Sequence, residues 1–226
     1  MTKQQTKSKQ RVADHGEVFT AEREVNAMLD LVKSETENIE SRFLEPACGD
    51  GNFLAEILRR KLAVVKFRYE KNPDDYERYA VIAVTSIYGV DILADNVQDC
   101  RSCLFEIFDT DYTAVCKDDA NDDTRKAVRH ILQHNILCGD ALTMETTNGE
   151  PIEFAEWSAL NGVLLKRRDF RFNHLLNANE QKLYLNDLFG GGDEEGRFER
   201  DETGASVALS IREFPPIHYR KLGNDE

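Results

Sequence analysis

The stretch from Phe43 to Leu54 constrains the fold of this chain more than any other part of the sequence. A short apolar run ends in the acid Glu45, a Gly-x-Gly turn follows at Gly49 and Gly51, and an apolar helical pattern then begins. Glycines in such a turn let the backbone approach a ligand closely, and this strand–loop–helix layout is typical of nucleotide sites in doubly wound α/β domains. The sequence therefore predicts an α/β fold with a ligand site at this loop.

Length and composition indicate one globular domain. The chain has 226 residues, of which 41% are hydrophobic and 31% charged, and it carries a formal charge of −13. No apolar run is long enough for a membrane span, and residues 1–11 lack the apolar core of a signal peptide. The number of cysteines, five, is odd, and we expect them to be unpaired in a cytoplasmic protein. Cys100 and Cys103 match a C-x-x-C spacing, for which a plain helix surface is favoured over a metal or redox role.

The net negative charge argues against a free-standing nucleic-acid binder, because phosphate contacts depend on Lys and Arg. Any contact with DNA must use a local basic patch or a partner chain. Residues 106–123 hold seven acids and one Lys, which favours a solvated loop.

Hydrophobic periodicity in the first two thirds of the chain alternates between helices and strands. Helices are expected at 19–33, 52–65, 95–108 and 124–133, strands at 43–47, 87–90 and 135–138, and a turn at 72–75. This order predicts a mostly parallel sheet with right-handed crossovers and helices on both faces, as in a Rossmann-like fold.

The pattern weakens after Pro151. Residues 152–157 alternate like a strand, 173–188 have a helical spacing, Gly190–Gly192 indicate a linker, and 207–211 are compatible with a terminal strand. We therefore divide the chain into a disordered basic tail at 1–11, a domain at 12–188 and an acidic, Gly-rich C-terminal segment at 189–226.

Acidic residues fall at the carboxyl ends of the three predicted strands, namely Glu45, Asp91 and Asp140. In open α/β sheets, ligands bind outside the carboxyl ends of the strands, so these carboxylates are expected to meet at one site. A carboxylate after the second strand suits a ribose diol, since it can accept two hydroxyl hydrogen bonds.

The amino-acid sequence of the glycine loop resembles the S-adenosylmethionine (SAM) motif of DNA amino-methyltransferases, chiefly the adenine-N6 group of restriction–modification systems. Residues 88–92 resemble the second motif of that family and residues 135–142 the third, while 15–20 are similar to its leading motif, with Ala21 where the family usually has Pro. The resemblance implies roles for Glu45 near the SAM ammonium, Gly49 and Gly51 along its methionine part, Asp91 on the ribose, Asp140 on the adenine amino group and Thr20 on the carboxylate. Ala47, Ile92 and Ala141 lie inside these motifs and belong to the implied cofactor site. A helix N-cap is an equally good interpretation of Thr20.

The resemblance covers roughly residues 12–145 and does not extend to a target-base loop. Adenine-N6 methyltransferases carry an Asn/Asp/Ser-Pro-Pro-aromatic motif that holds the flipped base, and this sequence has none. The position of that loop is best matched by Glu156 and Trp157, which would accept from the amino group and stack on the base. A surface Glu and a buried Trp are the simpler interpretation of these two residues.

Two functions follow from the resemblance. The first is a SAM-dependent methyltransferase acting on DNA, at adenine N6, in a restriction–modification or phage-defence system. The second is a non-catalytic SAM-binding subunit that needs a partner chain, with Lys166, Arg167 and Arg168 touching DNA phosphates or the partner. A methyltransferase for a small molecule or protein is a third, weaker option, and a solvated surface is the simpler interpretation of the basic patch.

Overall fold

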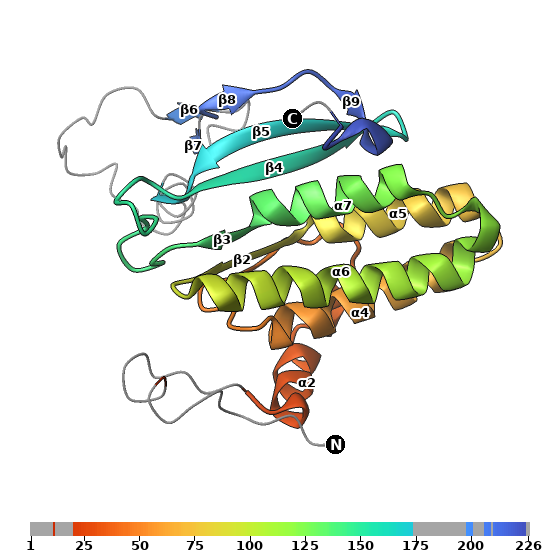
Figure 1. Cartoon of the computed structure of the whole chain (residues 1–226), viewed down its shortest axis with the longest axis horizontal. Coiled ribbons are helices and arrows are strands. Elements are labelled where there is room, and N and C mark those ends of the chain that lie inside the picture. The colour runs from red at the N-terminus through yellow and green to blue at the C-terminus, as the bar shows by residue number, and fades with distance from the viewer. Residues whose placement is uncertain (1–10, 12–19, 174–197, 201–205, 209, 225–226) are drawn as a thin grey trace.

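The computed structural model describes Arg11 and residues 20–173, 198–200, 206–208 and 210–224. Figure 1 shows three layers. The lower layer holds helices α4 (Asn52–Tyr69) and α6 (Ala94–Cys116), and the upper layer holds strands β4 (Glu153–Leu160) and β5 (Leu164–Arg171). In the middle layer, strands β2 (Ile87–Asp91) and β3 (Ile136–Cys138) are in line with helices α5 (Pro73–Thr85) and α7 (Asp122–Asn135). The candidate site lies at the carboxyl ends of the strands in the middle layer.

The middle layer contains a three-stranded parallel sheet of β1 (Phe43–Glu45), β2 (Ile87–Asp91) and β3 (Ile136–Cys138), in the order β1-β2-β3. Glu45 pairs with Gly89, and Asp91 pairs with Cys138. The predicted strands and their parallel arrangement are therefore confirmed. All five residues of β2 are buried, as a central strand requires.

Each crossover between these strands contains two helices. The first comprises α4 (Asn52–Tyr69) and α5 (Pro73–Thr85); the second comprises α6 (Ala94–Cys116), a 3₁₀ turn at Lys117–Asp119 and α7 (Asp122–Asn135). Helices α5 and α7 each lead directly into a strand, β2 and β3 respectively. The strands are short because these helices occupy the other half of the middle layer (Figure 1).

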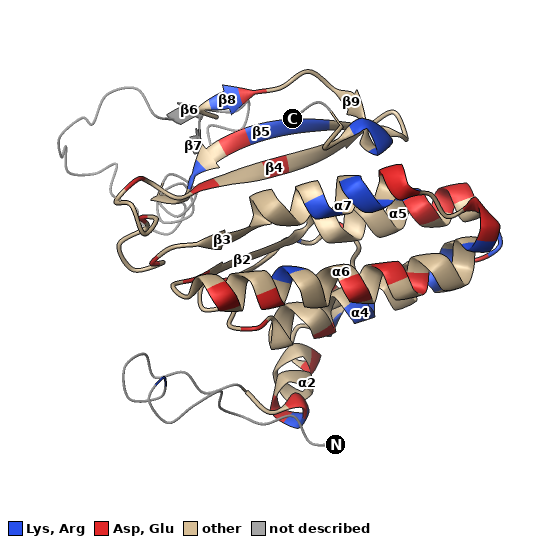
Figure 2. Cartoon of the chain, viewed as in Figure 1, with Lys and Arg blue, Asp and Glu red and all other residues tan. Residues whose placement is uncertain are grey.

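The predicted helix boundaries were partly wrong. The expected turn at 72–75 is the start of α5, where the Asn72 side chain accepts from the Asp75 N–H and Pro73 takes the first helical position. The expected acidic loop at 106–123 is largely helical, and Figure 2 shows its acids on the outer part of α6 and the turn into α7. The helix continues because Phe108, Tyr112 and Cys116 recur every four residues and are all buried.

The helix expected at 19–33 is interrupted. It divides into α2 (Glu22–Asp30) and α3 (Lys33–Thr36), with Leu31 exposed between them. Helix α2 packs on α4, where Arg60 forms an ion pair of 2.9 Å with Asp30 and donates to Asn26 Oδ1.

The second face of the sheet is covered by a β-hairpin, not by the helices that the sequence predicted. Strands β4 (Glu153–Leu160) and β5 (Leu164–Arg171) pair antiparallel along their full lengths. Tyr88 and Val90 on β2 pack against Phe154, with Ile152 and Phe172 beside it. The structure is thus a mixed α/β fold, in which the described residues form one parallel and two antiparallel sheets.

The C-terminal residues return to this body. Strands β8 (Arg212–Glu213) and β9 (Ile217–His218) pair with β5, and β6 (Phe198–Arg200) pairs with β7 (Ser206–Ala208). Part of the expected separate C-terminal segment therefore packs on the domain. The helix expected at 173–188, apart from Asn173, and the Gly190–Gly192 linker lie outside the described residues.

Glu77 on α5 ties the C-terminal residues to the helices. Its buried carboxylate accepts from Tyr219 Oη and Arg220 Nε, each at 2.6 Å, on one oxygen, and from Tyr112 Oη at 2.5 Å on the other. Asn121, the N-cap of α7, also donates to the second oxygen at 3.0 Å. This cluster joins α5, α6, α7 and the 3₁₀ turn at Tyr219–Lys221 through one charge.

None of the helices in the described part of the chain combines the length and apolar character that crossing a bilayer requires.

Candidate functional site

The glycine loop connects β1 to α4 at the carboxyl end of the sheet. The Cys48 N–H donates to the Val90 carbonyl at 2.9 Å, which fixes the loop to the neighbouring strand β2. Gly49 and Gly51 have φ angles of 54° and 92°, in the left-handed region that glycine adopts without strain. Gly51 is the N-cap of α4, so the partly positive end of that helix opens at the loop.

Asp91, the last residue of β2, closes the loop against the sheet. Its Oδ2 accepts from the Gly49 N–H at 2.9 Å, and its Oδ1 accepts from the Leu93 N–H at 2.9 Å and from Asn96 Nδ2 at 3.2 Å. A carboxylate offers about four acceptor positions, so these donors leave roughly one for a ligand. The residue as a whole is 9% exposed, so little of Asp91 is open to solvent.

Asp140 follows β3 and lies beside the end of β2. The Gly139 N–H donates to the Asp91 carbonyl at 3.0 Å, and Asp140 Oδ1 accepts from the Leu142 N–H at 2.8 Å. Two apolar side chains accompany these turns, since Ile92 is 49% and Leu142 92% exposed. The strand ends thus combine carboxylates with exposed apolar groups, a combination that suits a nucleoside.

Glu45 and Ala47 stand at the start of the loop. Burial raises the pKa of the Glu45 carboxyl, while a hydrogen bond of 3.4 Å from the Ala47 N–H opposes that rise. A cationic group near Glu45 would stabilise its charged form. Ala141 packs with the cluster around Tyr88 and Val90, directly after Asp140.

Thr20 lies directly before α2 and is half-buried. The N-cap of α2 is Ala21, which has no side-chain cap, so Thr20 does not cap this helix. The rest of the leading motif, at 15–19, lies outside the described residues.

The structure does not bring Glu156 and Trp157 to the glycine loop. Trp157 Nε1 donates at 2.9 Å to Asn135, whose own amide donates to the Thr85 and Ile87 carbonyls, at the amino ends of β3 and β2. Asp91 stands at the other end of β2, about 13 Å away at 3.3 Å per residue. Trp157 is buried, and Glu156 forms ion pairs with Arg42 at 2.6 Å and Arg168 at 2.5 Å. Neither side chain is placed to hold a base at the loop.

The predicted basic patch is neutralised within the protein. Lys166 pairs with Glu213 at 2.7 Å, Arg167 with Asp169 at 2.7 Å, and Arg168 with Glu156. These contacts lie on β5 and its neighbours, where Figure 2 shows adjacent blue and red segments. Each of the three cations lies within ion-pair distance of a carboxylate, although Arg168 shares Glu156 with Arg42, so a DNA phosphate would have to compete with these ion pairs.

Sequence reasoning missed two groups behind the loop. Cys48 and Cys100 are buried and their thiols contact each other; this contact, followed by burial, raises the pKa of Cys48. Asn96 was also missed, although its position one helical turn after Leu93, at the start of α6, marks it as able to reach Asp91. Within the described residues, no group of three or more metal-ligating side chains occurs.

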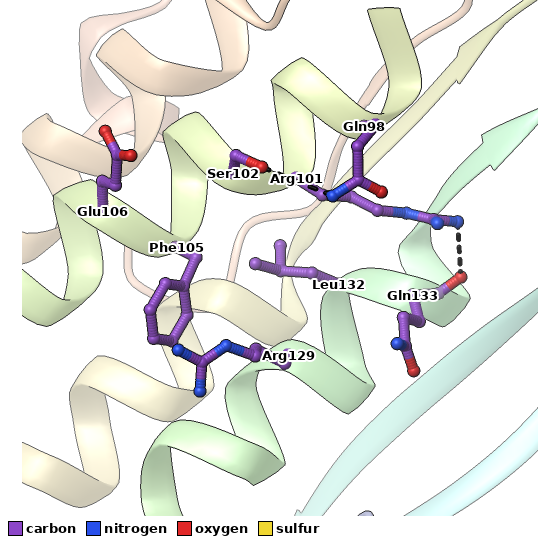
Figure 3. Close-up of a pocket in the computed structure, with 8 residues that line it drawn as sticks. All are labelled: Gln98, Arg101, Ser102, Phe105, Glu106, Arg129, Leu132 and Gln133. Carbon is purple, nitrogen blue, oxygen red and sulfur yellow. Dashed lines mark hydrogen bonds between the residues drawn. The ribbon is translucent and has the colours of Figure 1, made fainter. Parts of the chain in front are cut away.

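The surface cavities of the described residues include two in this part of the molecule. One, of about 490 Å³, is lined by Leu137, Cys138, Thr146, Glu150, Pro151, Ile152 and Glu153 and adjoins the Asp140 turn. The other, of about 330 Å³, lies between α6 and α7 (Figure 3). There Arg129 stacks 3.7 Å from the Phe105 ring centre, and Arg101 donates to the Gln133 and Ile136 carbonyls. No strand-end acid lines the second cavity, so it is separate from the glycine loop.

Comparison of the chain with protein-family models, curated proteins and solved structures found no match in any of the three.

Proposed function

We propose that this protein binds SAM at the carboxyl end of its parallel sheet and serves the methylation of DNA at adenine N6 in a restriction–modification or phage-defence system. The observation that carries the proposal is the hydrogen bond from the Gly49 N–H to Asp91, beside the bond from the Gly139 N–H to the Asp91 carbonyl. These bonds join the glycine loop and the two following strand ends, the places where the SAM motifs are expected.

The chemistry of these residues fits SAM. The N-terminus of α4 suits the carboxylate of its methionine part, and Glu45 suits the ammonium. The open acceptor position of Asp91 suits a ribose hydroxyl, and Asp140 suits the adenine amino group, with Ile92 and Leu142 offering apolar surface to the ring. Bound SAM supplies an electrophilic methyl group, and the protein's contribution is to hold it in line with the acceptor.

Two versions of this function differ in where the target base is held. In the first, this chain alone transfers the methyl group. In the second, the chain is a SAM-binding subunit, and a partner chain supplies base recognition and completes catalysis. The position of Glu156 and Trp157 at the amino end of the strands favours the second version. The ion pairs of Lys166, Arg167 and Arg168 argue against the contact with DNA or a partner that the sequence suggested for this patch.

Calorimetric titration with SAM tests the cofactor site. We expect saturable heat for the wild type and at least a tenfold higher Kd for Asp91→Ala, because the loss removes a charged acceptor. The control is Asp118→Ala, an equal change of charge in the exposed turn before α7, which should keep the wild-type Kd. Absence of heat and of a thermal shift with the wild type would remove the proposal.

Transfer of a tritiated methyl group to adenine-rich duplex DNA tests the two versions. An inert chain that gains activity when mixed with the product of a neighbouring gene supports the subunit. Activity of the isolated chain supports the self-sufficient enzyme, and digestion to nucleosides then identifies the methylated base.

A further inference from the structure

Arg11 reaches the start of α6 from the N-terminal end of the chain. Its Nη1 lies 2.5 Å from Asp95 Oδ2, and its Nη2 donates to Asn96 Oδ1 at 3.0 Å and to Asp95 Oδ1 at 3.3 Å. The sequence separation is 84 residues to Asp95 and 85 to Asn96. The contact therefore fixes two distant parts of the chain to each other beside the candidate site.

The bond from Arg11 sets the orientation of the Asn96 amide. A guanidinium has donors only, so it must meet the amide oxygen, and the amide nitrogen then points the other way. That nitrogen donates to Asp91 Oδ1 at 3.2 Å. Asn96 is 1% exposed, so little space exists for the amide to turn over.

The bond from Asn96 in turn restricts Asp91. Together with the Gly49 and Leu93 N–H groups, it fixes both carboxylate oxygens and hence the direction of the open acceptor position. An acceptor held in one direction before binding spares the ligand the cost of ordering it. Arg11, Asn96 and Asp91 therefore form a directional chain of hydrogen bonds that ends at the rim of the sheet.

We infer that Arg11 is a positioning residue of the cofactor site, which acts through Asn96 to hold the Asp91 carboxylate toward the ribose of the ligand. The inference rests on the proposed function for the identity of the ligand. It adds a residue from outside the three strand-end motifs, and a role for Asn96 that does not require contact with the ligand.

The decisive variant is Arg11→Lys. A lysine keeps the positive charge near Asp95, but its single ammonium replaces a fork that spans Asp95 and Asn96, so the bond to Asn96 is lost. We expect Arg11→Lys and Arg11→Ala each to raise the Kd for S-adenosylhomocysteine about tenfold, measured by calorimetry. The matched control is Arg23→Ala, an exposed arginine on α2, which should bind as the wild type does.

A double-mutant cycle separates this role from general support of the fold. In an Asn96→Ala background, Arg11→Ala should change the Kd less than about twofold, because the route to Asp91 is already broken. Wild-type affinity in Arg11→Lys would show that charge alone acts on Asp95, and full additivity in the cycle would show that Arg11 does not act through Asn96. Either result overturns the inference.

A second readout does not need the ligand. The Gly49 and Leu93 amide hydrogens are both bonded to Asp91, so their exchange with solvent, followed by nuclear magnetic resonance, should accelerate in Arg11→Lys and in Asn96→Ala but not in Arg23→Ala. If the wild type bound neither SAM nor S-adenosylhomocysteine, the proposed function would fail while this exchange pattern still tested the hydrogen-bond chain. Unchanged exchange in both variants would overturn that chain independently.

Discussion

The sulfur of Cys100 lies 2.8 Å from the point that a Cβ atom on Gly51 would occupy. Helix α6 therefore packs directly on the backbone of the glycine loop, and Gly51 also has a φ of 92°. The loop keeps its shape because this residue has no side chain.

We expect Gly51→Ala to lower the free energy of unfolding by about 2 kcal/mol, since it adds both a contact and left-handed strain. Chemical denaturation measures the change. Cys100→Ala in the same chain should restore only part of the loss, because the Cys100 Cα and Cβ would still stand 3.4 Å from the new methyl group. A Gly51→Ala protein as stable as the wild type would contradict this packing.

Glu77→Gln should destabilise the protein by about 3 kcal/mol, because it leaves the Arg220 guanidinium without its buried counter-charge. The control is Asp74→Asn. Asp74 also approaches Arg220, at 3.8 Å, but it is 93% exposed, so its loss should cost less than about 0.5 kcal/mol. If the two variants lowered the free energy of unfolding equally, the burial of Glu77 would not explain its contribution to stability.

The acid stability of the protein should also depend on Glu77. Burial would raise the pKa of this carboxyl, but hydrogen bonds from Arg220, Tyr112 and Tyr219 outweigh it and lower the pKa below its ordinary value of 4.5. The stabilisation is therefore complete above pH 4.5 and is lost as the pH falls through the lower folded-state pKa. The unfolding free energy of Glu77→Gln should decline less steeply below pH 4.5 than that of the wild type.

Lys61 makes stability depend on pH in the same direction, but near neutral pH. Its ammonium is fully buried on α4 and donates to the Ile39 carbonyl at 3.1 Å, to Ser86 Oγ at 2.6 Å and to the Ser41 carbonyl. Burial lowers its pKa to about 7, against the opposing effect of Glu35. The unfolded chain therefore binds more protons between pH 7 and the ordinary lysine pKa, so stability rises with pH in that interval.

The rise should approach about 1 kcal/mol per pH unit between pH 7.5 and 8.5, below the ordinary titration of thiols. Denaturation of the wild type and of Lys61→Met at each pH measures it. The difference between the two slopes isolates Lys61 from other titrating groups, and parallel slopes would show that its ammonium stays charged when buried.

Trp157→Phe should destabilise the protein by about 1 kcal/mol, because Asn135 Oδ1 loses the indole N–H that satisfies it. SAM affinity, measured by calorimetry, should stay at the wild-type value, since Trp157 lies at the amino ends of β2 and β3. A loss of SAM binding with unchanged stability would show that Trp157 does belong to the cofactor site.

The sequence predicted the parts of the fold whose pattern is local. Short apolar runs ending in Glu45, Asp91 and Asp140 are parallel strands in the structure, and the glycine turn lies where the spacing placed it. The extension of α6 through acidic residues was missed, because charge marks only the outward face while Phe108, Tyr112 and Cys116 decide burial. The hairpin on the second face was missed because its alternating pattern fits several pairing partners equally well.

In the candidate site, too, only the features with a local sequence pattern could be predicted. Position at a strand end was enough to select Asp91, whereas the contact of Arg11 with Asn96 depends on tertiary packing across 85 residues of sequence. Trp157 and Glu156 carry suitable chemistry, but only the register of β4 against β5 and its packing on α7 determine that they point elsewhere.

The Glu77 cluster has a consequence for biosynthesis. A ribosome releases α5 long before Arg220, so Glu77 in a nascent chain lacks its counter-charge until the 3₁₀ turn at Tyr219–Lys221 emerges. Messages cut short before codon 220 should therefore yield polypeptides in which Glu77 lacks its contact with Arg220. Such polypeptides should be open to proteolysis. Correct packing around Glu77 thus depends on translation having passed Arg220.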